Sequence, residues 1–307
     1  MRQSARRQHG RNLIELMISI TIGLVVMGAI IAVYTATSST SRQSDAASRM
    51  SEDAAVAMNY IASYVRMAGF SFPQANVPRN TVTMGNATVE LVDQNFGGAG
   101  IRGCDAGFSD PSVSATTSLT CATGTGPAAL VVRFEGDTSN TFPTSGRPSD
   151  CLAQGVEVTA ASDFDASLTY TPVEARFFVR NGTSSATPEL FCAGNGGTTT
   201  NFLAQPLMQY VDNMVLRYGI AENVSGRGVV RYVTASQIDA LGGTMDQNWS
   251  RVISVKICLV MRSEIPDQNG PGRYIDCGGS AVVASDQFLR RTFTSVVTLR
   301  NRGSISL

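Results

Sequence analysis

Apolar residues form one long uninterrupted run near the N-terminus. No charged residue occurs over residues 16–41, and the strongly apolar part, residues 16–34, is 19 residues long. A helix of about 20 apolar residues spans the hydrocarbon core of a bilayer. The pattern therefore predicts a transmembrane helix over about residues 12–34.

The helical pattern continues beyond the apolar run. Apolar residues recur at intervals of three and four, which places them on one face of a helix: Met50, Ala54, Met58, Ile61, Val65 and Ala68. No proline occurs over residues 1–72, and Gly69 followed by Pro73 gives a stop signal. We predict one helix over residues 12–68, within a helical region 11–69, whose upper half packs on a folded head.

The pattern after the helix is that of short strands. Residues 70–128 are rich in Gly, Ser and Thr, which indicates loops. Strand-like runs follow, separated by Gly, Pro, Asn and Ser clusters, at residues 129–136, 173–180, 207–220, 229–235, 251–263 and 290–302. Their spacing favours antiparallel pairing. The predicted fold class is α+β, with one long N-terminal helix packed on a mainly antiparallel β head over residues 70–307.

Two of these runs alternate clearly enough to assign a core face. In the run 251–263 the predicted inward residues are Ile253, Val255, Ile257, Leu259 and Met261, and the opposite face carries Ser254, Lys256 and Cys258. In the run 290–302 the predicted inward residues are Phe293, Val297 and Leu299.

Charge around the apolar run predicts its direction in the membrane. Arg2, Arg6, Arg7 and Arg11 precede the run, whereas the charges that follow it are mixed. By the positive-inside rule the N-terminus lies in the cytoplasm and the remainder outside. Residues 1–10 hold three arginines and no acid, so the rest of the chain has 21 basic and 24 acidic residues. That acidic excess argues against a nucleic-acid partner.

The six cysteines are an even number and all follow the apolar run. They are Cys104, Cys121, Cys151, Cys192, Cys258 and Cys277. This usage predicts disulfides in an oxidising compartment, with 15 possible connectivities. We predict the sequential pairing 104–121, 151–192 and 258–277, in which each bridge closes a local loop; the alternative is buried free thiols with a single bridge.

The residue inventory argues against an enzyme. His9 is the only histidine, which removes Ser-His-Asp and Cys-His nucleophiles, HExxH proteases and most catalytic zinc sites. The sequence has no phosphate-binding glycine loop of an assembly ATPase. Ser254 and Lys256 lie two apart on one strand face, but a polar sheet surface explains them without a nucleophile. No catalytic residue and no cofactor is predicted.

Two further groups of polar residues are candidate binding sites. Asp267, Asn269 and Asp276 offer oxygen ligands for calcium, but their spacing does not match an EF-hand loop, and a turn explains the Asn-Gly and Pro-Gly pairs. Four arginines bracket the last strand, and we interpret them as solvated ends or subunit contacts rather than a DNA site: Arg290, Arg291, Arg300 and Arg302. No metal site is predicted.

Glu15 is the unexpected residue at the head of the apolar run. A secretory signal peptide, with a cleavage site of small residues at 36–38, is one explanation of the run. A carboxylate in a disposable apolar core costs insertion energy, however, so this explanation leaves Glu15 unaccounted for. Near a helix N-terminus a carboxylate is favoured by the helix dipole, by about 0.3–1 kcal/mol.

The N-terminal segment "G|RNLIELMISITIGLVV" resembles the class III signal of type IV prepilins and type II secretion pseudopilins. It has a short basic leader ending in Gly10 and a Glu at the fifth position after that glycine. The resemblance implies that a prepilin peptidase cuts between Gly10 and Arg11, removing residues 1–10, and methylates the new terminus at Arg11. It also implies that Glu15 neutralises an α-amino group during assembly. Arg11 stands where the family usually has Phe or Met.

Four later blocks resemble PilW-family minor pilins: "YIASYVRMAGF", "LMQYVDNMVLRYGI", "WSRVISVKICLVMRS" and "RRTFTSVVTLRN". The resemblance implies an inner-membrane minor pilin with a periplasmic head that helps to start or cap a type IV pilus. Its implied partners are the prepilin peptidase, other minor pilins, the major pilin, the assembly platform and membrane lipid. The alternatives are a minor pseudopilin of a type II secretion system and a stalked periplasmic adhesin or binding domain.

Overall fold

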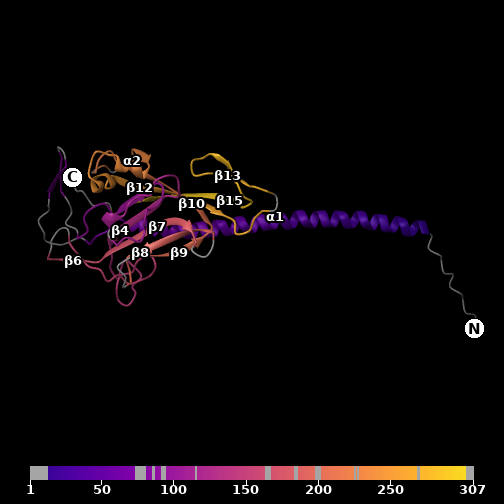
Figure 1. The fold of residues 1–307 in the computed structure, drawn as a ribbon, viewed down its shortest axis with the longest axis horizontal. Helices are drawn as coiled ribbons and strands as arrows, with labels where there is room; N and C mark the ends of the chain where they lie inside the picture. The colour runs from indigo at the N-terminus through magenta and orange to yellow at the C-terminus, as the bar shows by residue number, and fades with distance from the viewer. Residues whose placement is uncertain are drawn as a thin grey trace, which may run out of the picture. The chain divides into compact units, whose positions relative to one another are not determined.

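The computed structural model describes residues 13–72, 81–84, 87–90, 95–114, 116–162, 167–182, 186–197, 202–224, 226, 228–267 and 270–301. The chain divides into two compact units, residues 1–48 and residues 49–307. Helix α1, Leu13–Met67, belongs to both (Figure 1). The predicted helix over residues 12–68 is therefore confirmed to within one residue at each end.

The upper half of α1 is a core element of the second unit. The predicted apolar face is buried, at Met50, Ala54, Met58, Ile61, Val65 and Ala68, and Ala57 and Ala62 join it. The helix ends at Gly69, whose φ of 71° is the left-handed conformation that favours glycine at a helix C-terminus. The Gly69 N–H donates to the carbonyl oxygen of Arg133 at 2.9 Å, which ties the helix end to a strand.

Strands of the second unit form two larger antiparallel sheets. One has the order β3-β4-β7-β8-β9 and the other β11-β10-β12-β15. The bounds of the first are β3 Ile101–Cys104, β4 Ala129–Glu135, β7 Pro172–Asn181, β8 Pro188–Gly194 and β9 Leu203–Gln209. Those of the second are β11 Arg231–Val233, β10 Val211–Ile220, β12 Val252–Arg262 and β15 Arg290–Thr298. The predicted α+β class is confirmed.

Shorter elements complete the head. Three two-stranded sheets pair β1 with β2, β5 with β6, and β13 with β14. Their bounds are β1 Thr81–Met84, β2 Ala87–Glu90, β5 Ala160–Ala161, β6 Thr169–Tyr170, β13 Arg273–Ile275 and β14 Ala281–Val283. The short helices are η1 Thr116–Ser118, α2 Ala235–Asp239 and α3 Met245–Trp249.

A single apolar core joins α1 to one face of each large sheet. Alternation decides which strand residues enter it, and Val255, Ile257, Leu259 and Met261 of β12 are fully buried as predicted. The ring centroids of Tyr64 on α1 and Phe177 on β7 lie 5.5 Å apart. A smaller apolar cluster covers the opposite face of the five-stranded sheet, at Cys104, Ala129, Phe178, Phe191, Ala193 and Phe202.

The structure corrects the prediction of one continuous strand over residues 207–220. Tyr210 has a φ of 61° and separates β9 from β10, which belong to different sheets. A left-handed residue interrupts the extended backbone of a strand, so a continuous apolar pattern here serves two strands. Similarly, Trp249 does not lead β12 but ends α3, where it is buried.

Candidate functional site

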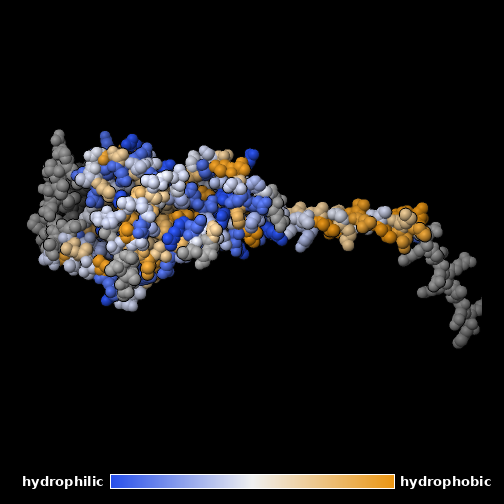
Figure 2. All heavy atoms as spheres, in the orientation of Figure 1, coloured by the Kyte–Doolittle hydropathy of each residue, from blue (hydrophilic) through white to orange (hydrophobic). Residues whose placement is uncertain are grey.

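The part of α1 in the first unit presents an apolar surface on all sides. Every large apolar side chain over residues 13–34 is more than half exposed, and these residues appear as the orange segment of the helix in Figure 2. In the described part of the chain, α1 is the one helix long and apolar enough to cross a membrane. A surface of this kind requires lipid or other apolar helices around it.

Glu15 lies in the first turn of α1 and is exposed. Its carboxylate makes no hydrogen bond or ion pair to any described residue of this chain. A carboxylate at this end of a helix is favoured by the dipole, but in an apolar medium it still needs a cation or a hydrogen-bond donor. Within the described residues the Glu15 carboxylate therefore has no group that would neutralise it.

Four hydroxyl groups in or near the apolar part of the same helix donate to its own backbone. Ser19 Oγ donates to the Glu15 carbonyl oxygen at 2.7 Å, and Thr21 Oγ1 donates to the Ile18 carbonyl oxygen at 2.9 Å. Thr35 and Thr40 donate in the same way to carbonyl oxygens one turn earlier, at 3.0 Å each. Such back-bonding lets a hydroxyl enter an apolar medium without an unpaired donor.

The predicted processing residues Gly10 and Arg11 lie outside the described residues, as do His9 and the rest of the leader. The cleavage and methylation sites therefore remain predictions from the sequence.

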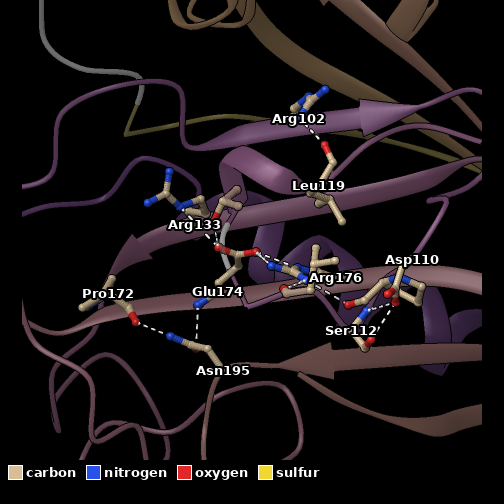
Figure 3. Close-up of polar contacts among 12 residues, drawn as sticks. Arg102, Asp110, Ser112, Leu119, Arg133, Pro172, Glu174, Arg176 and Asn195 are labelled. Carbon is tan, nitrogen blue, oxygen red and sulfur yellow. Dashed lines mark hydrogen bonds and ion pairs between the residues drawn. The ribbon is translucent and has the colours of Figure 1, made fainter. Parts of the chain in front are cut away.

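A buried charged pair on β7 organises the outer face of the five-stranded sheet (Figure 3). Arg176 Nε donates to Glu174 Oε1 at 2.7 Å, and the Arg176 side chain is fully buried. Its Nη1 donates to the carbonyl oxygens of Pro111 and Val113 at 2.8 and 2.6 Å. The guanidinium also lies 3.5 Å from the ring centroid of Phe202. Burial lowers the pKa of Arg176, while Glu174 opposes that shift.

The second oxygen of Glu174 extends the network to neighbouring elements. Glu174 Oε2 accepts the Thr116 hydroxyl and lies 3.5 Å from Arg133 Nε. The Glu174 N–H donates to Asn195 Oδ1 at 2.9 Å, and Asn195 Nδ2 donates to the Pro172 carbonyl oxygen at 2.6 Å. The network fastens Pro111, Val113 and Thr116 to the sheet, so we assign it a structural role. The sequence feature that could have predicted this network is the pair Glu174 and Arg176, two residues apart in the otherwise largely apolar run 173–180.

All six cysteines are paired in the predicted sequential pattern. Cα–Cα distances are 5.3 Å for Cys104–Cys121, 6.4 Å for Cys151–Cys192 and 5.9 Å for Cys258–Cys277. The bridges fasten, in that order, β3 to the following loop, residue 151 to β8, and β12 to the β13–β14 hairpin. Each therefore attaches an irregular segment to a sheet.

Ser254 and Lys256 are not brought together as a reactive pair. Ser254 is buried and its Oγ lies 3.3 Å from Tyr232 Oη, whereas Lys256 is exposed. No hydrogen bond joins Ser254 to Lys256. The interpretation of this pair as a polar sheet surface is confirmed for Lys256 and wrong for Ser254, which is buried.

Asp276, considered above as a calcium ligand, caps a turn. Its Oδ1 accepts the N–H groups of Gly278 and Ser280 at 2.9 and 2.8 Å, within the β13–β14 hairpin. Asn269 lies outside the described residues. Among the described residues there is no group of three or more His, Cys, Asp or Glu placed to hold a metal.

Arg290 is an interior ion-pair residue and not a solvated strand end, which corrects the prediction. Its Nε donates to Asp212 Oδ2 at 2.7 Å, and its Nη1 and Nη2 donate to the two oxygens of Asp286 at 2.5 and 2.8 Å. These bonds lower the pKa of Asp286 to about 2 and raise that of Arg290. Arg291 and Arg300 are exposed, as expected, and Arg302 lies outside the described residues.

The β13–β14 hairpin offers an apolar surface on the head. Ile275 is 55% exposed and Val283 56% exposed, with Ala281 exposed on the same face. The register pairs Ile275 with Ala281 and Arg273 with Val283, which places these side chains together. The Cys258–Cys277 bridge holds the hairpin to β12. A fixed apolar face of this kind suits a contact with another protein.

The chain is similar to a known protein family over part of its length. Residues 176–301 match the PilW model, described as Type IV Pilus-assembly protein W. The match covers three of the four blocks on which the resemblance was based. No curated protein and no solved structure matches the chain.

Proposed function

We propose that this chain, which belongs to the PilW family of type IV pilus-assembly proteins by its match over residues 176–301, is a minor pilin. The family implies a role in type IV pilus assembly. Our proposal is that the chain helps to start or cap the pilus as a structural subunit, polymerises through α1, and catalyses no reaction.

The observation that carries the proposal is the division of one helix into two environments. Residues 13–34 expose apolar side chains on all sides, whereas the face from Met50 to Ala68 is buried in the head core. Exposed apolar surface is stable only in lipid or against other apolar helices. The lower half of α1 can therefore leave the bilayer for a bundle of similar helices while the head keeps its own core.

Glu15 then has a specific role in assembly. Cleavage after Gly10 creates an α-amino group at Arg11, with a reference pKa near 7.7–8, which carries positive charge at neutral pH unless it is desolvated. A charge of this kind inside a helix bundle is tolerated when an opposite charge pairs with it. Glu15 of one subunit would pair with the methylated terminus of its neighbour.

The proposed topology follows from the same features. Residues 1–10 are the leader, residues 11–69 the helix with its membrane segment at about 12–34, and residues 70–307 the periplasmic head. Three disulfides favour an oxidising compartment for the head. The partners would be the prepilin peptidase, other minor pilins, the major pilin, the inner-membrane platform and lipid. The β13–β14 surface is a candidate for head contacts.

Substitution of Glu15 tests the role of the helix. In a strain lacking the gene and complemented with Glu15→Gln, we expect pilus number to fall at least about tenfold, because each helix contact would hold a buried terminus without its opposite charge. The amount of protein in the membrane should be unchanged. Glu52→Gln is the matched control, because Glu52 is an exposed acid on the upper half of the same helix. Wild-type pilus number and content with Glu15→Gln would contradict the pairing role.

Substitution of Gly10 tests the processing. We expect Gly10→Val to leave an uncut precursor that keeps residues 1–10, detected by the intact mass of the membrane-extracted protein. A normally cut product would contradict the assignment of residues 1–10 as a class III leader that is cut after Gly10. Normal pili combined with lost protein secretion in the deletion strain would instead indicate a secretion pseudopilin.

A further inference from the structure

Two arginines line one cleft of the head. The cleft has a volume of about 350 Å³ and lies where β7 and β12 end and β8 and β10 begin. Its walls include the charged residues Arg180, Arg262 and Asp212 and the apolar residues Pro127, Val179 and Pro188. This combination of two cations, one carboxylate and an apolar lining is that of a small polar-ligand site.

Both guanidinium groups are oriented by aromatic rings. Arg180 Cζ lies 4.3 Å from the ring centroid of Phe191, and Arg262 Cζ lies 4.4 Å from that of Phe288. Stacking on a ring holds the plane of a guanidinium and leaves its N–H edge free for an acceptor. Arg262 Nε is enclosed and has no acceptor among the described residues. The rings, and not internal ion pairs, therefore position these two side chains.

The nearby carboxylates make no ion pair with the two arginines, although Asp286 interacts with Arg262 over a longer distance. Asp212 and Asp286 are both hydrogen-bonded to Arg290. Glu189 is opposite Arg180 in the β7–β8 register, yet its Oε1 accepts from Gln209 at 3.4 Å and no ion pair joins it to Arg180. In the described part of the chain, Arg180 and Arg262 have no carboxylate within ion-pair distance.

We infer that this cleft binds the carboxylate of an acidic peptide segment from a partner protein. Arginine pairs preferentially with planar carboxylates through two parallel N–H···O bonds. Because the wall also holds the Asp212 carboxylate, a ligand with one negative charge fits the cleft better than a phosphate monoester, which carries nearly two. The apolar walls suit the methylene groups of an acidic side chain. The identification of the partner as another pilus subunit rests on the proposed function.

The binding test uses the full chain in nonionic detergent and two capped peptides. Acetyl-Gly-Glu-Gly-amide supplies one carboxylate, and acetyl-Gly-Gln-Gly-amide is its uncharged isostere. By ligand-observed NMR titration we expect the Glu peptide to bind with a Kd of roughly 1 mM, and the Gln peptide at least about tenfold more weakly.

Arginine variants locate the site. Arg180→Gln and Arg262→Gln should each weaken binding of the Glu peptide by at least about tenfold, the usual scale for a lost charged hydrogen bond. Arg291→Gln is the matched control, since Arg291 is exposed and outside the cleft, and it should bind as the wild type does. If Arg262→Gln fails to fold, the test relies on Arg180→Gln. Arg180 is exposed, so its replacement should not prevent folding.

Three results would overturn the inference. They are equal binding of the two peptides, wild-type binding by both cleft variants, and no detectable binding of the Glu peptide up to 10-fold above the expected Kd. Arginine-dependent binding to phosphatidylglycerol vesicles that the Glu peptide does not displace would assign the cleft to lipid. The binding assay uses purified protein and does not depend on pili. If the protein binds the Glu peptide but a strain lacking the gene has normal pili, the binding site is confirmed and only the pilus subunit as its partner is rejected.

Discussion

Gly100 lies directly against Gly69, the residue that ends α1. A Cβ atom on Gly100 would overlap the nitrogen and Cα of Gly69 and the carbonyl carbon of Ala68. Two backbone hydrogen bonds frame this contact: Gly69 N–H to the Arg133 carbonyl at 2.9 Å, and Arg133 N–H to the Gly100 carbonyl at 2.8 Å. The end of the helix is thereby fixed against the five-stranded sheet.

Gly100→Ala should destabilise the head by about 1–3 kcal/mol, because the added methyl group displaces backbone atoms that cannot rotate away. Denaturant unfolding of the full chain in nonionic detergent measures the change in the free energy of unfolding. Gly242→Ala is the control, since a Cβ there has no neighbour within 4 Å. Equal stabilities of the two variants would show that the helix end is not held at this contact.

Arg176→Met should cost about 3–5 kcal/mol of unfolding free energy, because it leaves the buried Glu174 carboxylate without its main partner. Arg147→Met is the control: the Arg147–Glu157 pair is about half exposed, and its loss should cost less than about 1 kcal/mol. The double variant Glu174→Gln with Arg176→Met should recover part of the loss. Similar costs for Arg176→Met and Arg147→Met would refute the assigned structural role.

Tyr218→Phe should leave stability unchanged or raise it. The Tyr218 hydroxyl is fully buried and has no hydrogen-bond partner in the described part of the chain, and burial raises its pKa well above the ordinary value. Removing an unpaired buried hydroxyl relieves a desolvation cost. Tyr60→Phe should instead cost about 1 kcal/mol, because Tyr60 Oη donates to the Cys151 carbonyl oxygen at 2.6 Å. A larger loss of unfolding free energy for Tyr218→Phe than for Tyr60→Phe would contradict the assignment of the Tyr218 hydroxyl as unpaired.

Asp286 should contribute to stability only above acidic pH. Its pKa is lowered from 3.8 to about 2 by hydrogen bonds from Arg290. The unfolded chain therefore binds the proton first, so the contribution is complete above about pH 4 and is lost as the pH falls toward 2. Because the side chain is 35% exposed, we expect no more than about 1 kcal/mol.

Unfolding of the wild type and Asp286→Asn across this pH range measures the effect. The difference in their free energies of unfolding should be constant near neutral pH and should shrink below about pH 4. A difference that stays constant down to pH 2 would show that Asp286 titrates normally in the folded chain.

Local sequence patterns were enough to predict the long helix, the buried face of β12 and the disulfide pairing. The 3.6-residue period, the absence of proline and the Gly69 stop were sufficient for α1, because a helix depends on contacts within four residues. Alternation predicted the buried side of β12 for the same reason. The three disulfides join consecutive cysteines, 17, 41 and 19 residues apart. The predicted sequential pairing is therefore confirmed.

Helices α2 and α3 were not predicted, although the sequence next to them contains a helix-start motif. Thr234 and Thr244 each begin a capping box closed by Gln three residues later, which identifies α2 and α3. β8 is fully buried over its seven residues and therefore lacks the alternation on which the strand predictions relied.

Only the tertiary structure decided how distant segments meet. The left-handed Tyr210 divides one apolar run between two sheets, and the burial of Arg290 depends on Asp212, a residue 78 positions away. The same holds for the stacking of Arg180 on Phe191 of β8 and of Arg262 on Phe288, which precedes β15. Periodicity reports which face of an element is buried. It does not report which elements cover that face, because that depends on long-range packing of the whole chain.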